Sequence, residues 1–394
     1  MNKFIYLTAI VFIFSSCKKE SIKANYKSQV QGNTATAVSS LQNLDISIDA
    51  IGVIELPISV DSKIRSTFKW YTKVTAPNGK PIHLLAQNNW TKEKVAYTRT
   101  VLENYLTSDL TLIYGNKTEV ANNIANSFGA MTMFNDANSV SSNNSGVNGQ
   151  DLQADETVAV GSPEYLDLSV RNAALEEILH FVHDLGLSTT FPQFQKNLES
   201  ATAYSIDNYF FVPWSGLPVA DYDNELLAAF NDSYWGTTEH NAGLDKPYIF
   251  LSREASEVGD VQTTNLMRSL LSPYMQSTQL IANSFNGTFY LTKTSSLPYT
   301  NQSQYYKSIK LLGENNSNVE GNNLDNSFTG NKGNNSFNGL LGTDNVYFSG
   351  SSTEYTIATS GTITTVSDNV NNRDGEDKLT AIETITFSDT IIHL

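Results

Sequence analysis

The sequence is poor in cysteine, in basic residues and in long apolar runs, and each shortage excludes a class of protein. Its single cysteine, Cys17, rules out an intrachain disulfide framework and a cysteine-based zinc cluster. The chain has 25 Lys and Arg against 40 Asp and Glu, a net charge of −15. This balance excludes nucleic acid as a partner, because phosphate backbones are bound by basic side chains. No run after the N-terminus approaches the roughly 20 apolar residues that a membrane-spanning helix needs.

What the chain does contain indicates a folded protein. Hydrophobic residues make up 40% of its 394 residues, and the 19 Tyr and 19 Phe argue against wholesale disorder. Charged residues make up only 16%, below the usual share of about 25%, so the polar surface must be largely uncharged. The length allows two or three domains and a sizeable core.

The N-terminus has the pattern of an export signal. A lysine at position 3 precedes an apolar run over 4–14, and two serines follow before Cys17. Residues 14–17 resemble a bacterial lipobox, in which the cysteine is lipidated and becomes the mature N-terminus. The resemblance implies a signal peptide over 1–16 and an extracytoplasmic protein, lipid-anchored to a bacterial membrane at the cell surface or periplasmic face. The alternative is an ordinary signal peptide that happens to contain Cys17.

The body of the chain alternates strand-like and helix-like segments, which predicts a mixed α+β domain over 44–305. Residues 17–43 are polar and predict a flexible tether in front of this domain. Apolar periodicity predicts strands within 44–60 and over 68–74, 81–87 and 131–133. It predicts helices over 91–106, 170–187, 193–209, 223–235 and 262–284.

Three nine-residue units lie end to end in the C-terminal part of the chain, beginning at Gly321, Gly330 and Gly339. Each unit has glycine first, Asn or Asp at position six and Phe or Val at position eight. A fixed period of nine predicts a parallel β-roll whose glycines permit the tight turns. The eighth residues are expected to stack inward: Phe328, Phe337 and Val346.

These units resemble the nonapeptide calcium repeats of RTX proteins, and the segment 346–389 resembles the β cap that follows such repeats. The resemblance implies a β-roll and cap over 306–394, with calcium at the sixth positions, Asn326, Asn335 and Asp344. Only Asp344 keeps a carboxylate there, and amides weaken calcium binding because they bring no negative charge. The alternative is a largely metal-free roll held by its apolar stack.

The densest group of metal-ligand residue types falls on one predicted helix, within 174–186. At roughly 100° per residue, Glu176, His180 and His183 share one narrow stripe, while apolar side chains cover the opposite side. Two imidazoles and a carboxylate on one face suit a divalent metal ion. The alternative is that the stripe is the solvated face of an amphipathic helix.

This helix also resembles the active-site helix of zincin metallopeptidases, which reads His-Glu-x-x-His and is followed by a second helix with an Asn-Glu pair. The matching residues here read Glu176-Glu177-x-x-His180, with Asn224-Glu225 downstream. The resemblance implies a zincin-like domain with Glu176, His180 and Glu225 as metal ligands. It also implies Glu177 as the general base that takes a proton from water.

Glutamate in place of the first histidine leaves the choice of ion and ligands open. A carboxylate-rich site would take zinc or another divalent ion, recruit His183, or hold none. Asp184 would orient one of the imidazoles by contacting the ring nitrogen that does not bind the metal. The resemblance implies an exported metal-dependent peptidase, intact or degenerate, that acts on a peptide or protein substrate. The alternative is a non-enzymatic cell-surface protein that binds calcium or mediates adhesion.

Overall fold

The computed structural model describes residues 34, 36–107, 114–167, 170, 172–237 and 247–394. Cys17 and the signal peptide lie outside the described residues, so the lipid anchor stays a prediction. Val38 and Leu41 are fully buried in one apolar cluster with Phe68 and Tyr71, so the packed chain begins inside the segment predicted as a tether. Within the ranges just given, no helix has the length and apolar character needed to cross a membrane.

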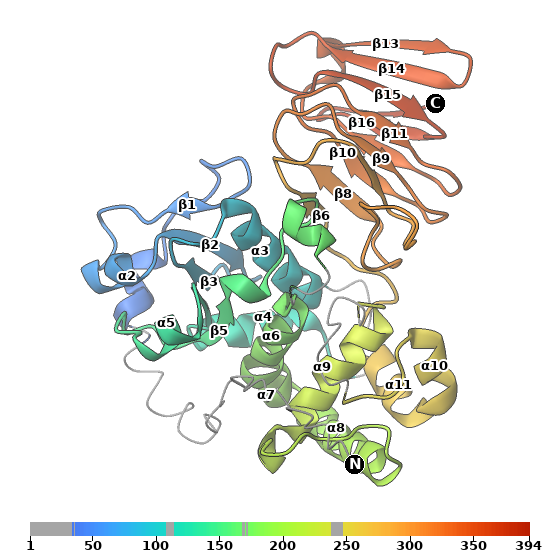
Figure 1. The fold of residues 1–394 in the computed structure, drawn as a ribbon. Helices are drawn as coiled ribbons and strands as arrows, with labels where there is room; N and C mark the ends of the chain where they lie inside the picture. The colour runs from blue at the N-terminus through green and yellow to red at the C-terminus, as the bar shows by residue number, and fades with distance from the viewer. Residues whose placement is uncertain (1–33, 35, 108–113, 168–169, 171, 238–246) are drawn as a thin grey trace, which may run out of the picture.

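A five-stranded mixed sheet forms the base of the N-terminal half (Figure 1). The strand order is β1-β2-β3-β4-β5, antiparallel from β1 to β3 and parallel from β3 to β5. The strands are β1 (Ile54–Glu55), β2 (Trp70–Thr75), β3 (Pro81–Ala86), β4 (Ala130–Phe134) and β5 (Gln150–Gln153). The strands predicted over 68–74, 81–87 and 131–133 are confirmed, whereas most of 44–60 forms turns.

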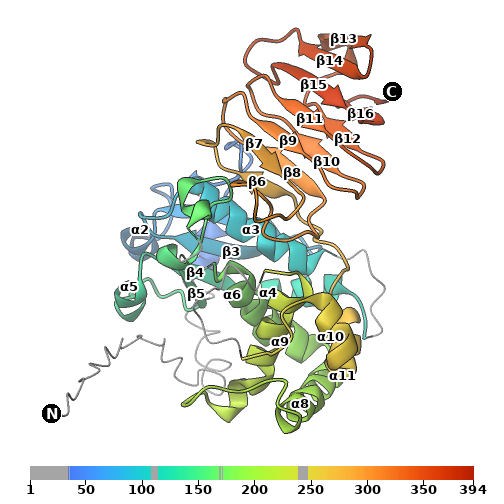
Figure 2. The same cartoon turned by 45° about the vertical axis from the view of Figure 1, so that its right-hand side comes forward.

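Helices cover one face of this sheet and then form a separate lobe (Figures 1 and 2). Leu84 and Met131 pack toward α3, α4 and α6, while Leu85 and Phe134 face the N-terminal segment on the other side. Helices α8 to α11 form the lobe. The helices are α2 (Ser62–Thr67), α3 (Lys92–Leu106), α4 (Lys117–Asn126), α5 (Ala137–Ser141), α6 (Ala174–Val182), α7 (Ser188–Thr190), α8 (Pro192–Asp207), α9 (Tyr222–Tyr234), α10 (Arg253–Gly259) and α11 (Val261–Arg268).

The helix predicted over 262–284 is wrong beyond Arg268, where α11 ends. Pro273 follows, and it cannot continue a helix because it lacks the backbone N–H and its ring clashes with the preceding turn. The next segment, β6 (Gln279–Ile281), instead pairs in parallel with β8 (Ser308–Leu311). Pairing with a distant strand therefore overrides the apolar periodicity here.

The C-terminal part is a roll of two six-stranded sheets that lie face to face (Figure 2). One sheet has the order β17-β16-β12-β10-β8-β6 and the other β13-β14-β15-β11-β9-β7. The remaining strands are β7 (Thr288–Tyr290), β9 (Asn318–Glu320), β10 (Ser327–Thr329), β11 (Ser336–Asn338), β12 (Asn345–Tyr347), β13 (Tyr355–Ser360), β14 (Ile363–Asp368), β15 (Glu376–Thr380), β16 (Thr384–Thr386) and β17 (Ile391–His393). Strands β6 and β7 precede residue 306, at which the resemblance to RTX repeats placed the start of the roll.

The inward stack predicted from the nine-residue period is confirmed. Phe328, Phe337 and Val346 are fully buried, and the rings of Phe328 and Phe337 stack with centroids 5.5 Å apart. Parallel pairing aligns Phe328 with Val346 across β10 and β12. The apolar core of the roll is continuous with the core beneath α3 and α6, so the roll packs on the helical half.

The sixth positions of the units form a ladder of hydrogen bonds inside the bends. Asn326 Oδ1 accepts from the backbone N–H of Asn322, and Asn335 Oδ1 accepts in the same way from Asn331, both at 2.9 Å. The backbone N–H of Asn326 donates to Asp344 Oδ1 at 2.7 Å. The asparagine amides are thus engaged by the protein itself, at the positions where the resemblance placed calcium ligands.

Two buried aspartates complete this ladder, and the sequence pattern identified only one of them. Asp344 Oδ1 and Asp377 Oδ1 accept backbone N–H groups of Asn326 and Asn335. Their second oxygens, both Oδ2, are buried without a hydrogen-bond partner among the described residues. Burial raises the pKa of Asp344 to about 6 and that of Asp377 to about 8.

Replacing Asp344 and Asp377 together by asparagine should stabilise the roll in calcium-free buffer at alkaline pH. An acid whose pKa is raised in the folded chain holds its proton there, so stability falls as the pH rises from about 4 towards about 8. The neutral amides remove this loss, with a gain of about 1–3 kcal/mol at pH 8.5 and none at pH 3. Urea unfolding at both pH values measures it.

This prediction would be contradicted if the double variant were no more stable than the natural chain at pH 8.5.

The effect of millimolar calcium on the melting temperature provides a second comparison. If the two carboxylates bind calcium, the ion should raise the melting temperature of the natural chain and leave the double variant unchanged. A natural chain that shows no shift would favour the metal-free roll.

Candidate metal centre

Helix α6 carries the predicted ligand stripe, and neither of its faces is open to solvent. Leu175 and Ile178 pack into the core, as expected from the apolar side of the pattern. On the polar side, Glu177 and His180 keep only 7% and 1% of their surface exposed, and Glu176 is half-buried. The stripe is therefore covered, mainly by α9, and is not the solvated face of an amphipathic helix.

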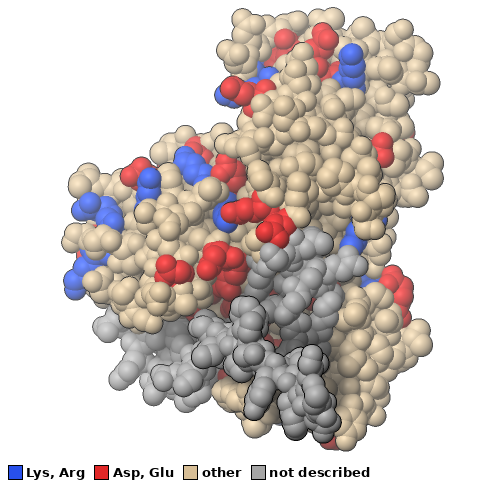
Figure 3. Space-filling view, viewed as in Figure 1, with Lys and Arg blue, Asp and Glu red and all other residues tan. Residues whose placement is uncertain are grey.

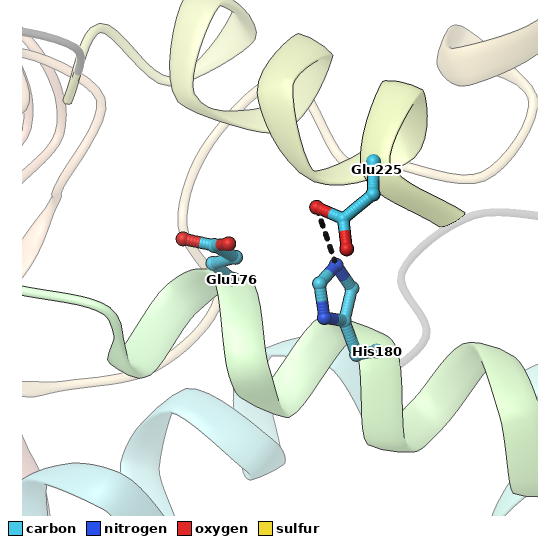
Figure 4. A group of neighbouring side chains, drawn as sticks. All are labelled: Glu176, His180 and Glu225. Carbon is cyan, nitrogen blue, oxygen red and sulfur yellow. Dashed lines mark ion pairs between the residues drawn. The ribbon is translucent and has the colours of Figure 1, made fainter. Parts of the chain in front are cut away.

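Glu176, His180 and Glu225 converge where α6 meets the first turn of α9 (Figure 4). Each offers one ligand atom, and these atoms all lie within 4.8 Å of one another. His180 Nε2 is 3.9 Å from Glu225 Oε2. Two ligand atoms bound to one ion at about 2.0–2.2 Å are at most about 4.4 Å apart, so this pair already suits a shared ion. The group could bind a divalent metal ion.

Glu177 lies against the other nitrogen of the same imidazole. Its Oε2 is 3.7 Å from His180 Nδ1 and accepts a hydrogen bond from Gln150 Nε2 at 2.7 Å. A carboxylate beside Nδ1 favours a proton on that nitrogen, which leaves Nε2 as the atom that faces Glu225. Gln150 belongs to β5, the edge strand of the sheet, and nothing in the sequence pattern marked it as part of the site.

His183 does not join this group. Its Nδ1 lies 2.9 Å from Asn224 Oδ1 and its Nε2 lies 2.8 Å from Gln195 Oε1. Seven residues separate it from Glu176, about 10 Å of helix rise, which is too far for one ion to bind both. His183 instead links α6 to α8 and α9, and the sequence did not reveal this role.

Asp184 and Asn224 both act on His183. Asp184 Oδ1 is 3.3 Å from His183 Nδ1, so this carboxylate approaches the imidazole that lies outside the group. Asn224 holds the same ring, and its neighbour Glu225 faces His180. The predicted Asn-Glu pair is thus split between two histidines, one that positions the helices and one in the candidate centre.

Charge favours a cation at this place. Glu176, Glu177 and Glu225 bring three carboxylates around one imidazole, and two of the three are more than nine-tenths buried. Buried carboxylates are costly unless a positive charge compensates them. Acidic side chains also gather across the middle of the face in Figure 3, below the roll. A divalent ion bound there would add positive charge beside these carboxylates.

The histidines given no role from the sequence are placed as follows. His83 is buried in β3, where its Nδ1 lies 3.0 Å from the hydroxyl of Tyr71 and burial lowers its pKa to about 4. It is a core residue. His393 is in β17 at the end of the cap, and His240 lies outside the described residues.

Comparisons with family models, with curated proteins and with solved structures found no match for the chain. The resemblance to zincins and to RTX repeats therefore depends on the quoted motifs alone. Independently of these motifs, the geometry of α6 and α9 forms a group at Glu176, His180 and Glu225 that could bind a metal ion.

Metal content should separate ligands from positioning residues. The purified mature protein should hold about one divalent ion per chain, and a Glu176→Ala/His180→Ala variant should lose it. His183→Ala should keep the ion but lose about 1–3 kcal/mol of stability, because buried amide groups are left without their partner. Elemental analysis and urea unfolding measure the two effects. Equal metal in the natural and double-variant proteins, or complete loss in His183→Ala, would contradict this assignment.

Proposed function

We propose that the chain is an exported, membrane-anchored metal-dependent hydrolase of peptide bonds. The observation that carries the proposal is the convergence of Glu176, His180 and Glu225 from two helices, with Glu177 beside them. Three protein ligands are the number that catalytic metal sites use, because the remaining positions stay open for water and substrate. The resemblance of the motif to the zincin pattern points to a peptide or protein as substrate.

The residues of the chain divide the work in the following way. Glu176, His180 and Glu225 would hold the ion, which supplies Lewis acidity and lowers the pKa of a water molecule. By the zincin pattern, Glu177 would be the general base that accepts the proton of the attacking water. Gln150 donates to one oxygen of Glu177 and so fixes the plane of that carboxylate.

Hydrolysis and metal binding should separate in a Glu177→Gln variant. The amide is isosteric with the carboxylate but cannot take a proton, so kcat should fall by about 10²–10⁴-fold while the metal content stays unchanged. A broad fluorogenic peptide library, tested with zinc, manganese and cobalt, provides the assay. The proposal would be contradicted if the natural protein cleaved no peptide with any of these ions. It would also be contradicted if the Glu177→Gln variant were as active as the natural protein.

The membrane anchor follows from the lipobox-like residues that end at Cys17. A Cys17→Ser variant should be recovered in the soluble extracytoplasmic fraction, whereas the natural chain should sediment with membranes and dissolve in detergent. Membrane association that survives the substitution would contradict lipidation at Cys17.

A calcium-binding surface protein without catalysis is the second candidate. The buried Oδ2 atoms of Asp344 and Asp377, without partners in the described part of the chain, favour it because they are sites that a cation could occupy. The calcium comparison on the roll and the peptide-cleavage assay decide between the two candidates.

A further inference from the structure

A buried hydroxyl group connects the two helices that carry the candidate metal ligands. Tyr105, in the last turn of α3, donates from its hydroxyl to the carbonyl oxygen of Leu175 on α6 at 2.8 Å. Asn231 on α9 donates from Nδ2 to the same hydroxyl at 3.0 Å. Leu175 directly precedes the ligand Glu176, and α9 also carries the ligand Glu225. The two hydrogen bonds therefore run from one ligand helix to the other through α3.

The direction of both bonds follows from the chemistry of the hydroxyl. A tyrosine hydroxyl has one proton and a carbonyl can only accept, so that proton is used in the bond to Leu175. Asn231 must then present its donor, Nδ2, to the oxygen of Tyr105. The side chains of Tyr105 and Asn231 are 4% and 0% exposed, so bulk water has little access to either bond. Burial also raises the pKa of the Tyr105 hydroxyl well above its usual value, so the hydroxyl keeps its proton at neutral pH.

The bond to Leu175 acts on the backbone of Glu176. The carbonyl group of Leu175 and the Cα of Glu176 belong to one planar peptide unit, so a bond that fixes the carbonyl also fixes the point from which the Glu176 side chain starts. Glu176 is the least enclosed of the three ligands, because it is half-buried while His180 and Glu225 are buried. In Figure 4 a dashed line joins His180 to Glu225, and the carboxylate of Glu176 lies to one side of that pair. Its approach to a shared ion therefore depends on how the first turn of α6 is held.

We infer that Tyr105 is a positioning residue of the metal centre, which holds the first turn of α6 so that Glu176 reaches the ion shared with His180 and Glu225. This inference rests on the proposed metal centre. Tyr105 acts through the backbone beside Glu176, and its bond from Asn231 ties that backbone to α9. Outer groups that orient metal ligands typically change metal affinity by about 10–100-fold when they are removed.

Replacement of Tyr105 by phenylalanine removes the hydroxyl alone. The ring stays, and with it the contact with Trp235, whose ring centroid is 5.6 Å away. The matched control is Tyr165→Phe. The Tyr165 hydroxyl belongs to an equally buried side chain, donates to the carbonyl of Thr300 at 2.9 Å and accepts from the backbone N–H of Gln302 at 3.1 Å. It makes bonds of the same kind, but to the segment that leads into the roll.

Metal affinity of the mature full-length chain, stripped with EDTA, measures the effect. Zinc and manganese are titrated in competition with a chelating dye, and cobalt is followed by its visible absorption, which reports the arrangement of ligands around the ion. Tyr105→Phe should bind these ions about 10–100-fold more weakly than the natural chain and should change the cobalt spectrum. Tyr165→Phe should keep the affinity and the spectrum of the natural chain. A loss of packing alone would lower the melting temperature without changing the cobalt spectrum.

A second variant covers the case in which Tyr105→Phe does not fold, as judged by circular dichroism. Asn231→Leu removes the bond from α9 to the hydroxyl and should weaken metal binding by about tenfold. Unchanged binding in Asn231→Leu would then count against the inference.

The inference would be overturned if Tyr105→Phe bound the ions with the affinity and spectrum of the natural chain, or if Tyr165→Phe lost as much affinity. A natural chain that binds none of the three ions would remove the metal centre and the inference with it. Peptide cleavage is not a readout here, so a chain that binds metal and cleaves no peptide would remove only the peptidase proposal.

Discussion

Buried negative charge is the constraint on which the rest of the structure depends. The contact between α6 and α9 encloses Glu177 and Glu225 and half-buries Glu176, and the imidazole of His180 lies beside these carboxylates. Carboxylates removed from water are stable only if positive charge or strong hydrogen bonds replace the lost hydration. A divalent cation bound by Glu176, His180 and Glu225 is one group that can meet this requirement.

The surrounding elements hold the two helices at this spacing. His183 ties α6 to Asn224 at the start of α9 and to Gln195 on α8. At the other end of α9, Lys293 Nζ donates to the carbonyl of Gly236 at 2.6 Å, and Arg253 stacks on the rings of Tyr234 and Tyr305. Tyr305 lies in the chain that leads into β8. These contacts join the segment that leads into the roll to the end of α9, the helix that carries Glu225. The roll therefore helps to position α9, whether or not it binds calcium.

The sequence predicted those features that depend on short-range patterns. The nine-residue period identified the inward stack of Phe328 and Phe337, and the helical stripe identified Glu176 and His180. The helical stripe did not distinguish His183 from the metal-centre residues. Residues on the same side of a helix can still be far apart along its axis, and the stripe records only the side. Gln150 and Asp377 were missed since each acquires its role from a partner 27 or 42 residues away. The helix predicted over 262–284 failed for the same reason, through pairing of β6 with the distant β8.

Anomalous diffraction from crystals of the mature protein, grown with zinc and with manganese, tests the central claim most directly. A bound ion should give one strong peak between α6 and α9, about 2.0–2.2 Å from oxygens of Glu176 and Glu225 and from His180 Nε2. His183 should keep its contacts to Asn224 and Gln195. Absence of a peak there with either ion, or a peak bound by His183 in place of Glu176, would contradict it.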